Sequence, residues 1–274
     1  MALTLAAAAQ QNFISTLIGG GPNNVPALDA DINGPQFVAF DNAGNYYFSA
    51  PYTSQRVFKV NASGTLTVVA GNGLQGYSGD NGPATQATLY NPEGVAVDGS
   101  GNVYIADFGN QVIRMVNSSG IISTIAGTGS CTYDGDTTGA GGDGKPATQH
   151  SLCQPNQITL DSSGNLFVAD ASNYRIRKLV ISSDSISTVA GDGTATACAN
   201  GVLATSCGFY LPNGIAVDSS GDLFISDTYD FIIREVVAAT DKVKTVAGTL
   251  GTPGDTGDGG PATSATLYNP LGWR

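Results

Sequence analysis

Four polar side chains occupy the same place in a repeated sequence pattern, and their types make them the first candidates for chemistry. Each follows a proline that opens a short apolar run, and they are Gln36, Glu93, Asn156 and Asn213. Carboxamides donate and accept hydrogen bonds in fixed directions, and a carboxylate accepts them. A set of this kind suits the recognition of a peptide, a protein surface or a carbohydrate.

Aromatic and cationic side chains follow the second apolar run of the same pattern and extend this candidate site. They are Tyr52, Phe108, Arg175 and Tyr229. An exposed aromatic ring supplies contact area while amides supply directional hydrogen bonds, so the two sets together predict a ligand-binding surface. The alternative is that the aromatic side chains pack between neighbouring repeats.

Metal and acid–base chemistry find little support in the residue types. The chain has one histidine, His150, which excludes a multi-histidine metal site and which we expect at the polar surface. Aspartate–glycine clusters could suggest calcium, which takes about six to eight oxygen ligands, but no EF-hand pattern is present. The best calcium candidate is the segment 133–143. We therefore predict no catalytic residue and no cofactor, with calcium as the alternative.

The four cysteines fall into two local pairs, Cys131 with Cys153 and Cys198 with Cys207. No C-x-x-C spacing supports a metal site, so we predict two disulfides in Gly/Ser/Thr-rich loops, with free buried thiols as the alternative. The alanine-rich residues 1–13 resemble the end of a signal peptide that lacks its charged start, or else form a tail. Together these features predict a secreted or periplasmic protein.

The charge balance and the lengths of the apolar runs argue against a nucleic-acid partner and a membrane span. Eleven Lys and Arg face 22 Asp and Glu, which gives a formal net charge of −11. Nucleic-acid binding needs a basic stripe for phosphate contacts, so we predict no nucleic-acid partner. No apolar run reaches the ~18 residues of a membrane-spanning helix, so we predict no membrane span.

The chain is a tandem repeat. Asp41, Asp98, Asp161 and Asp218 close four copies of one short pattern at intervals of 57, 63 and 57 residues. In each copy, runs of β-branched and aromatic residues alternate with Gly, Asn, Asp and Ser, which is the composition of hairpin turns. Four short antiparallel strands per copy predict an all-β fold, a β-propeller with four complete four-stranded blades.

The full repeat reads P-x-G-[IV]-A-[VL]-D-x-x-G-[ND]-[VL]-[YF]-[IV]-[AS]-D-x-x-[ND]-x-x-[IV]-R, and it resembles the NHL repeat over residues 35–268. The linker G-D-[NG]-G-P-A-T-x-A-T-L-Y-N-P, present at 79–92 and 257–270, resembles that of exported bacterial long-linker NHL proteins.

Three copies pair an aspartate that ends the second strand with an arginine on the third. The pairs are Asp107 with Arg114, Asp170 with Arg177, and Asp227 with Arg234. We expect each pair to form a carboxylate–guanidinium bridge between two strands of its blade, and the alternative is a ring of charged ligand contacts. The first copy carries Lys59 and no such aspartate, so we expect its bridge to be missing.

The repeat count defines the domain organisation. Residues 1–13 are a signal-peptide remnant or tail, and 14–274 form a single NHL-type propeller with blades at about 35–90, 91–153, 154–210 and 211–268, and partial blade segments at 14–34 and 269–274. An incomplete ring leaves open blade faces, which should favour a homo-oligomer or a bound partner.

We therefore predict a non-catalytic binding or scaffold module of an exported bacterial protein, with its ligand on the face that carries the linkers. One alternative is a lactonase-like or lyase-like hydrolase with a divalent metal in the central channel. The resembling lyases hold metal with histidines that this chain lacks there, whereas lactonase-like propellers use calcium ligands of which Glu93, Asn156 and Asn213 form a reduced set. Another alternative is a structural repeat that self-associates through open blade edges.

Overall fold

The computed structural model describes residues 22–131 and 146–272. Three predictions fall on other residues and lie outside the described part: the tail at 1–13, the first residues of the partial blade at 14–34, and the calcium candidate at 133–143. The first described strand, β1 (Val25–Pro26), precedes the first full repeat.

Four antiparallel sheets follow one another along the chain, one for each repeat. Blade 1 contains β2 (Val38–Phe40), β3 (Tyr46–Ala50), β4 (Arg56–Val60) and β5 (Thr65–Ala70), and blade 2 contains β6 (Pro92–Val97), β7 (Val103–Asp107), β8 (Val112–Val116) and β9 (Ile122–Ala126). Blade 3 contains β10 (Pro155–Leu160), β11 (Leu166–Asp170), β12 (Arg175–Val180) and β13 (Ser185–Ala190), and blade 4 contains β14 (Pro212–Val217), β15 (Leu223–Asp227), β16 (Ile232–Val237) and β17 (Lys242–Ala247).

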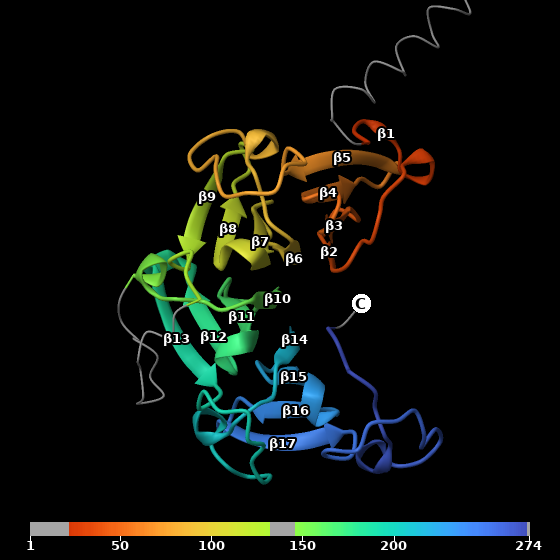
Figure 1. The fold of residues 1–274 in the computed structure, drawn as a ribbon, viewed down its shortest axis with the longest axis vertical. Coiled ribbons are helices and arrows are strands. Elements are labelled where there is room, and N and C mark those ends of the chain that lie inside the picture. Colours follow the sequence, from red (N-terminus) through yellow and green to blue (C-terminus); the bar gives the residue numbers. More distant parts are fainter. Residues whose placement is uncertain (1–21, 132–145, 273–274) are drawn as a thin grey trace, which may run out of the picture.

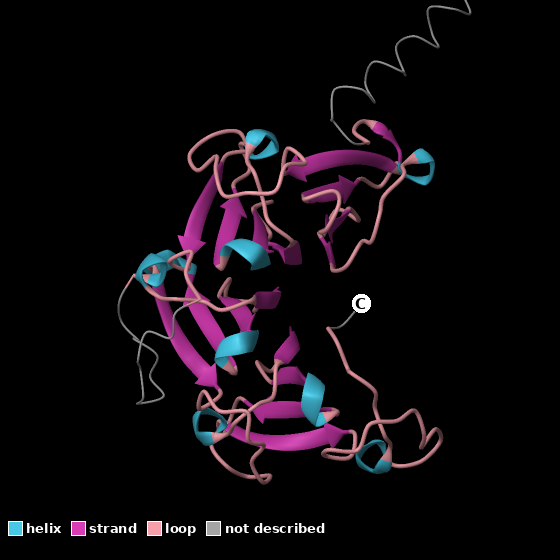
Figure 2. Cartoon of the chain, in the orientation of Figure 1, coloured by secondary structure: helices cyan, strands magenta, loops and turns pink. Residues whose placement is uncertain are grey.

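The helical elements of the described residues are short 3-10 turns (Figure 2). They are η1 (Ala27–Asp29), η2 (Ala84–Gln86), η3 (Phe108–Asn110), η4 (Ala147–Gln149), η5 (Ala171–Asn173), η6 (Ile181–Ser183), η7 (Ala204–Ser206), η8 (Thr228–Asp230) and η9 (Ala262–Ser264). None of them is long and apolar enough to cross a membrane.

The blades are arranged around a central axis as an open arc (Figure 1). The first strand of each blade, β2, β6, β10 or β14, lies nearest the axis, and β5, β9, β13 and β17 lie at the outer rim. The described residues place no sheet between blade 1 and the C-terminal segment. The predicted all-β propeller of four complete four-stranded blades is confirmed.

The repeated aspartate closes the first hairpin of every blade. Asp98 Oδ1 accepts hydrogen bonds from the backbone N–H groups of Ser100 and Asn102, both at 2.9 Å. Asp41, Asp161 and Asp218 make the equivalent pairs of contacts. An aspartate that bonds the backbone two residues on forms an Asx turn, so this residue is used to reverse the chain and is not available for a ligand.

Apolar side chains fill the space between blades. Val57 of blade 1 packs in one cluster with Ile105 of blade 2, and equivalent clusters join blades 2 and 3 and blades 3 and 4. The innermost strands approach so closely that a Cβ atom on Gly94 would collide with the carbonyl oxygen of Asn156. This contact explains the glycine of the repeat pattern, because only a residue without a side chain fits there.

Each linker joins the outer strands of two successive blades. In the linker after β5, the carbonyl of Ala84 accepts a hydrogen bond from Gly71 N–H at the end of β5. The N–H of Ala84 donates to the carbonyl of Gly120, beside β9 of the next blade. The short β1 pairs with β5 in the same way, with Val25 opposite Leu66. Residues 22–34 therefore bind blade 1 as a linker binds the blade that follows it.

Candidate functional site

The four polar residues that follow the repeat prolines converge at the central mouth of the arc. They line a cavity of about 190 Å³ together with Tyr52 and with three residues that were not in the predicted set. The lining residues are Gln36, Phe37, Tyr52, Glu93, Asn156, Asn213, Leu271 and Gly272. The structure thus brings five of the eight predicted ligand-binding residues into one cavity.

A bulge at the start of the inner strands of blades 2, 3 and 4 sets the place of three of these side chains. Pro92 pairs with Asp107, and the register then shifts before Val95, so Glu93 lies in the irregular part of β6. The same shift follows Pro155 in β10 and Pro212 in β14. A bulge interrupts the regular alternation of side chains and re-aims one of them. This repeated irregularity explains why one residue of each of these blades reaches the cavity.

Glu93 is the ionisable carboxylate of the cavity. Its residue is only 9% exposed, and the described residues give its carboxylate neither a hydrogen bond nor an ion pair. Burial raises the pKa of Glu93 to about 7. Because desolvation disfavours the charged form of an acid, this carboxylate lies in an environment that does not compensate its charge.

The asparagines differ in how much of their hydrogen-bonding capacity is free. Asn213 Nδ2 donates to Thr228 Oγ1 at 3.0 Å, which leaves its carbonyl oxygen as an acceptor. Asn156 Oδ1 is buried and has no hydrogen-bond partner among the described residues. The cavity therefore offers Glu93 and the Asn213 carbonyl oxygen as acceptors, beside the amide groups of Gln36 and Asn156.

The C-terminal segment closes one side of the mouth. Ser226 Oγ donates to the carbonyl of Leu271 at 2.9 Å, and Thr228 Oγ1 donates to the carbonyl of Pro270 at 2.8 Å. Gly272 then lies against Phe37 and Gln157. Leu271 follows Pro270 at the same place in the repeat but was not in the predicted set. Phe37 was missed because it replaces the glycine of the pattern, and that departure was the available signal.

Three predicted ligand-binding residues lie away from the cavity lining. Arg175 is buried and donates to the carbonyls of Asn173 and Asp192 at 3.1 and 3.2 Å, so its predicted role on an exposed binding surface is wrong. Phe108 is half-buried in η3. Tyr229 is 45% exposed, so it is available for contact with a partner.

A row of tyrosines in edge-to-face contact runs over the linker side of blades 3 and 4. The rings of Tyr210 and Tyr229 are 5.2 Å apart, and those of Tyr174 and Tyr210 are 6.4 Å apart, both in T-shaped geometry. Tyr210 was not in the predicted set. It occupies the tyrosine position of the linker motif, as Tyr90 does in the linker before blade 2. This row adds exposed aromatic area beside the mouth.

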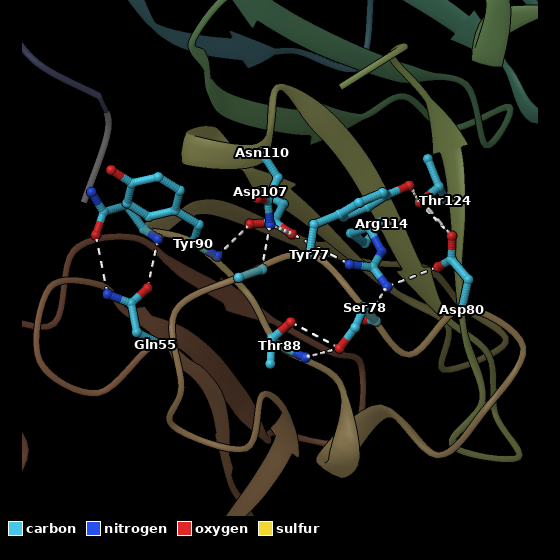
Figure 3. Close-up of polar contacts among 12 residues, drawn as sticks. Gln55, Tyr77, Ser78, Asp80, Thr88, Tyr90, Asp107, Asn110, Arg114 and Thr124 are labelled. Carbon is cyan, nitrogen blue, oxygen red and sulfur yellow. Dashed lines mark hydrogen bonds and ion pairs between the residues drawn. The ribbon is translucent and has the colours of Figure 1, made fainter. Parts of the chain in front are cut away.

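The bridge between Asp107 and Arg114 is present, within a larger network (Figure 3). Asp107 Oδ1 accepts from Tyr90 N–H at 2.8 Å, and Oδ2 accepts from Asn110 Nδ2 at 2.9 Å and from Arg114 Nη1 at 3.4 Å. Burial raises the pKa of Asp107 to about 6, since its desolvation outweighs these hydrogen bonds and the nearby guanidinium charge. The network is enclosed in blade 2 and is structural.

Arg114 makes its shortest ion pair with the linker and not with its own blade. Its Nη2 lies 2.8 Å from Asp80 Oδ1 and donates to the carbonyl of Ser78 at 3.1 Å, while the guanidinium lies over the Tyr77 ring (Figure 3). Thr124 Oγ1 donates to the second oxygen of Asp80 at 2.8 Å. One aspartate–glycine cluster that could suggest calcium is thus already neutralised by an arginine.

The other copies depart from this arrangement to different degrees. Arg177 Nη1 lies 3.9 Å from Asp170 Oδ2, a looser version of the bridge. Lys59 in blade 1 forms no ion pair within the described residues and lies 5.1 Å over the Tyr47 ring. The register places Phe58 of blade 1, opposite Phe48, where blade 2 has Arg114 opposite Ile105.

The bridge predicted between Asp227 and Arg234 is wrong for the described part of the chain, where these side chains form no ion pair. Arg234 Nη2 donates to the carbonyl of Cys198 at 3.0 Å, and Nη1 donates to Thr245 Oγ1 at 3.2 Å. Asp230 occupies the place of the asparagine that donates to the aspartate in blades 2 and 3, so Asp227 faces a second carboxyl group.

Both predicted disulfides are formed. Cys131 bonds Cys153, and Cys198 bonds Cys207, and the described residues include no free cysteine. Each disulfide fastens a linker on the side of the mouth. No three His, Cys, Asp or Glu side chains within residues 22–131 and 146–272 converge as a metal site.

His150 is buried, against the expectation of a surface residue, with 1% of the residue exposed. It follows η4 at the position where the sister linkers have the buried Ala87 and Cys207. A linker position that packs under the next blade therefore buries whatever residue it carries.

Comparisons with known sequences agree with this geometry. The sequence model of the teneurin NHL domain matches residues 53–135, and that of the NHL repeat matches residues 152–179. The chain thus contains NHL-repeat sequence and folds as a β-propeller. Mouse teneurin-4 is 33% identical over 150 residues, which cover 50% of this chain and 5% of the teneurin. Zebrafish teneurin-3 is 34% identical over 137 residues, which cover 44% of this chain and 5% of the teneurin. The NHL propeller thus spans about a twentieth of these relatives.

Solved structures share the fold at low sequence identity. An auxiliary nutrient binding protein from Bacteroides ovatus superimposes with a TM-score of 0.59 at 12% identity, over 89% of the NHL propeller and 54% of that chain. A chain of a nidogen/laminin complex gives a TM-score of 0.54 at 17% identity, over 88% and 68%. These similarities concern the fold alone.

Proposed function

We propose that this NHL propeller is an extracellular binding module that holds a segment of a protein partner at its central mouth. The observation that carries the proposal is Glu93, a carboxylate that lines the cavity and has neither a hydrogen bond nor an ion pair among the described residues. A buried polar group without a partner costs about 1–3 kcal/mol. A ligand that supplies donors would recover this cost.

An extracellular location is supported by the two disulfides, since disulfides persist in oxidising compartments. A protein partner is supported by the shared fold with a chain of a nidogen/laminin complex. The exposed rings of Tyr210 and Tyr229 add aromatic contact area beside the mouth, and tyrosine is enriched at protein interfaces.

A selection from a displayed random peptide library on the immobilised full chain tests this proposal. Selected peptides should bind the unmodified chain and lose at least tenfold in affinity with Asn156→Ala, measured by biolayer interferometry. Ser162→Ala is the matched control, because Ser162 is exposed in the β10–β11 turn at the opposite end of the same strand. Peptides that bind both variants equally well, or no selected peptide at all, would contradict a binding site at the mouth.

Self-association is a second candidate function, favoured by the open face of blade 1. The side turned away from blade 2 has a cavity of about 310 Å³ whose lining includes Val38, Tyr46 and Phe48. Phe40 belongs to the same face by strand alternation and is 69% exposed. Exposed apolar surface of this kind favours association.

Light scattering coupled to size exclusion tests this second candidate. We expect a species at a multiple of the 27.8 kDa chain mass, and a return to that mass with Phe40→Glu. Leu74→Glu, at an exposed linker position, is the control that should leave the mass unchanged. A monomer at all concentrations would contradict self-association.

A further inference from the structure

The mouth cavity offers a carboxylate and an amide oxygen as acceptors. Among the described lining residues, Glu93 contributes the one charged side chain, and Asn213 contributes its carbonyl oxygen. One hydrogen of the Asn213 amide is already donated to Thr228. A ligand that pairs Glu93 and the Asn213 oxygen brings donors and a positive charge. An ammonium group carries three donors and no acceptor.

The size of the cavity limits what part of a ligand it can enclose. Pockets that enclose a whole small molecule have volumes of about 300–1,000 Å³. The mouth cavity, at about 190 Å³, is smaller than this range. It therefore fits one side chain, while the rest of the ligand stays on the rim.

The apolar part of the lining fits the stem of such a side chain. Phe37, Leu271 and Tyr52 contribute carbon surface beside the acceptors. An aromatic ring also attracts a cation that lies over its face, so Phe37 and Tyr52 are compatible with an ammonium group as well as with its methylene stem. The net charge of −11 attracts cationic partners over a longer range.

We propose that the mouth cavity binds the ammonium group of a single lysine side chain of the protein partner, with Glu93 as its counter-charge. This rests on the proposed function of the mouth as a protein-binding site. A buried carboxylate without a partner is costly, and a bound ammonium group pairs it. The raised pKa of Glu93 agrees with an uncompensated carboxylate in the absence of a ligand.

The charge of Glu93 makes the interaction depend on pH. Among the described lining residues the other titratable side chain is the Tyr52 phenol, so Glu93 is the carboxylate that changes charge near neutrality. Since the pKa of Glu93 is raised to about 7, the carboxylate is protonated at pH 6 and ionised at pH 8. Lysine binding should therefore strengthen as the pH rises over this interval.

The test uses the tripeptide acetyl-Gly-Lys-Gly-amide with the full, disulfide-bonded chain. Binding is followed by NMR at the backbone amides of Gly94 and Gly272, next to and within the cavity lining. The matched probes are the same peptide with an acetylated lysine, which is neutral, and the peptide with arginine in place of lysine. We expect the lysine peptide to bind at least tenfold more tightly than the acetylated one and at least fivefold more tightly at pH 8 than at pH 6.

Variants locate the effect. Glu93→Gln should weaken the lysine peptide at least tenfold and remove its pH dependence, while Asn156→Asp, which adds a second carboxylate, should strengthen it several-fold. Glu235→Gln is the control, because Glu235 lies on β16 in an ion pair of 2.9 Å with Lys244, and it should have no effect. Unchanged affinity of Glu93→Gln together with unchanged affinity of Asn156→Asp would overturn the proposal.

The outcomes separate this proposal from the proposed function. If library-selected peptides bind at the mouth but the lysine peptide binds no better than its acetylated or arginine counterpart, the lysine proposal fails and the binding function stands. If neither the selected peptides nor the lysine peptide shifts the mouth amides, both fail.

Discussion

Asp230 lies beside Asp227 at the position where the two preceding blades place an asparagine. In blade 2 the equivalent asparagine, Asn110, donates from Nδ2 to Asp107 at 2.9 Å, and in blade 3 Asn173 donates to Asp170 at the same distance. An ionised carboxylate has no hydrogen to donate, so the blade 4 pair needs a shared proton to keep this contact. Asp227 is fully buried, which makes ionisation of both groups costly.

Asp230→Asn should stabilise the propeller at alkaline pH. Burial and the neighbouring Asp230 carboxylate raise the pKa of Asp227 from its ordinary value of 3.8 to about 8. The folded state thus holds a proton that the unfolded state releases between about pH 4 and 8, and stability contributed by this proton is lost as the pH rises over that interval. Urea unfolding should show a gain of about 1–3 kcal/mol for the variant at pH 8 and little gain at pH 5.

Asp258→Asn is the control for this comparison, because it removes the same charge from an exposed linker position. It should leave the free energy of unfolding unchanged at both pH values. An equal gain from the two variants would assign the effect to net charge and contradict the shared proton.

The repeat pattern predicted what repeats and could not predict what differs between copies. Strand order, blade number and the convergence of Glu93 and Asn156 followed from a pattern that places one residue per blade at the same height. The failure at Arg234 came from partners that the pattern does not contain, the linker carbonyl of Cys198 and the hydroxyl of Thr245. The burial of Arg175 could not be predicted from the sequence either. Its partners are the backbone carbonyls of Asn173 and Asp192, whose positions depend on the geometry of the loops.

Contacts between linker and blade were also beyond sequence analysis. Asp80 lies 34 residues before Arg114 in the chain and has no fixed spacing to it in the repeat pattern. The ion pair between them depends on how the linker crosses the face of blade 2. Linker composition indicated turns but not their path.

Arg114→Leu should destabilise the propeller by about 3–5 kcal/mol, because it leaves the buried Asp107 and the linker Asp80 without their shared cation. Urea unfolding measures the loss. Lys59→Leu, on the third strand of blade 1 and without an ion pair in the described residues, should cost less than about 1 kcal/mol. Similar costs for the two variants would show that the Arg114 network contributes no more than side-chain packing.

Replacing both Cys198 and Cys207 by serine should cost about 2–3 kcal/mol. The disulfide closes a short loop with a sequence separation of 9, for which the loss of chain entropy in the unfolded state predicts this value. Cys198 also accepts a hydrogen bond from Arg234 through its carbonyl, so the loop that it holds supports β16. Thermal unfolding of the variant and of the unmodified chain, each with and without reductant, measures the effect. Equal midpoints for the variant and the oxidised chain would contradict a stabilising role.

Leu211→Asn should stabilise the propeller, although it replaces an apolar residue. Leu211 precedes the proline of β14 and has a φ of 55°, in the left-handed region that costs most residues about 1–2 kcal/mol. Two sister positions with the same backbone, Asn91 and Asn269, carry asparagine, which adopts this conformation more readily.

The expected gain from Leu211→Asn is about 0.5–1 kcal/mol, which corresponds to a rise of about 1–4 °C in the midpoint of thermal unfolding for a chain of this size. Leu203→Asn is the matched control, because Leu203 has an ordinary φ of −60° and is half-exposed on its linker. It should leave the midpoint unchanged or lower it slightly. A loss of stability in Leu211→Asn as large as that of the control would mean that packing of the leucine side chain outweighs relief of the backbone.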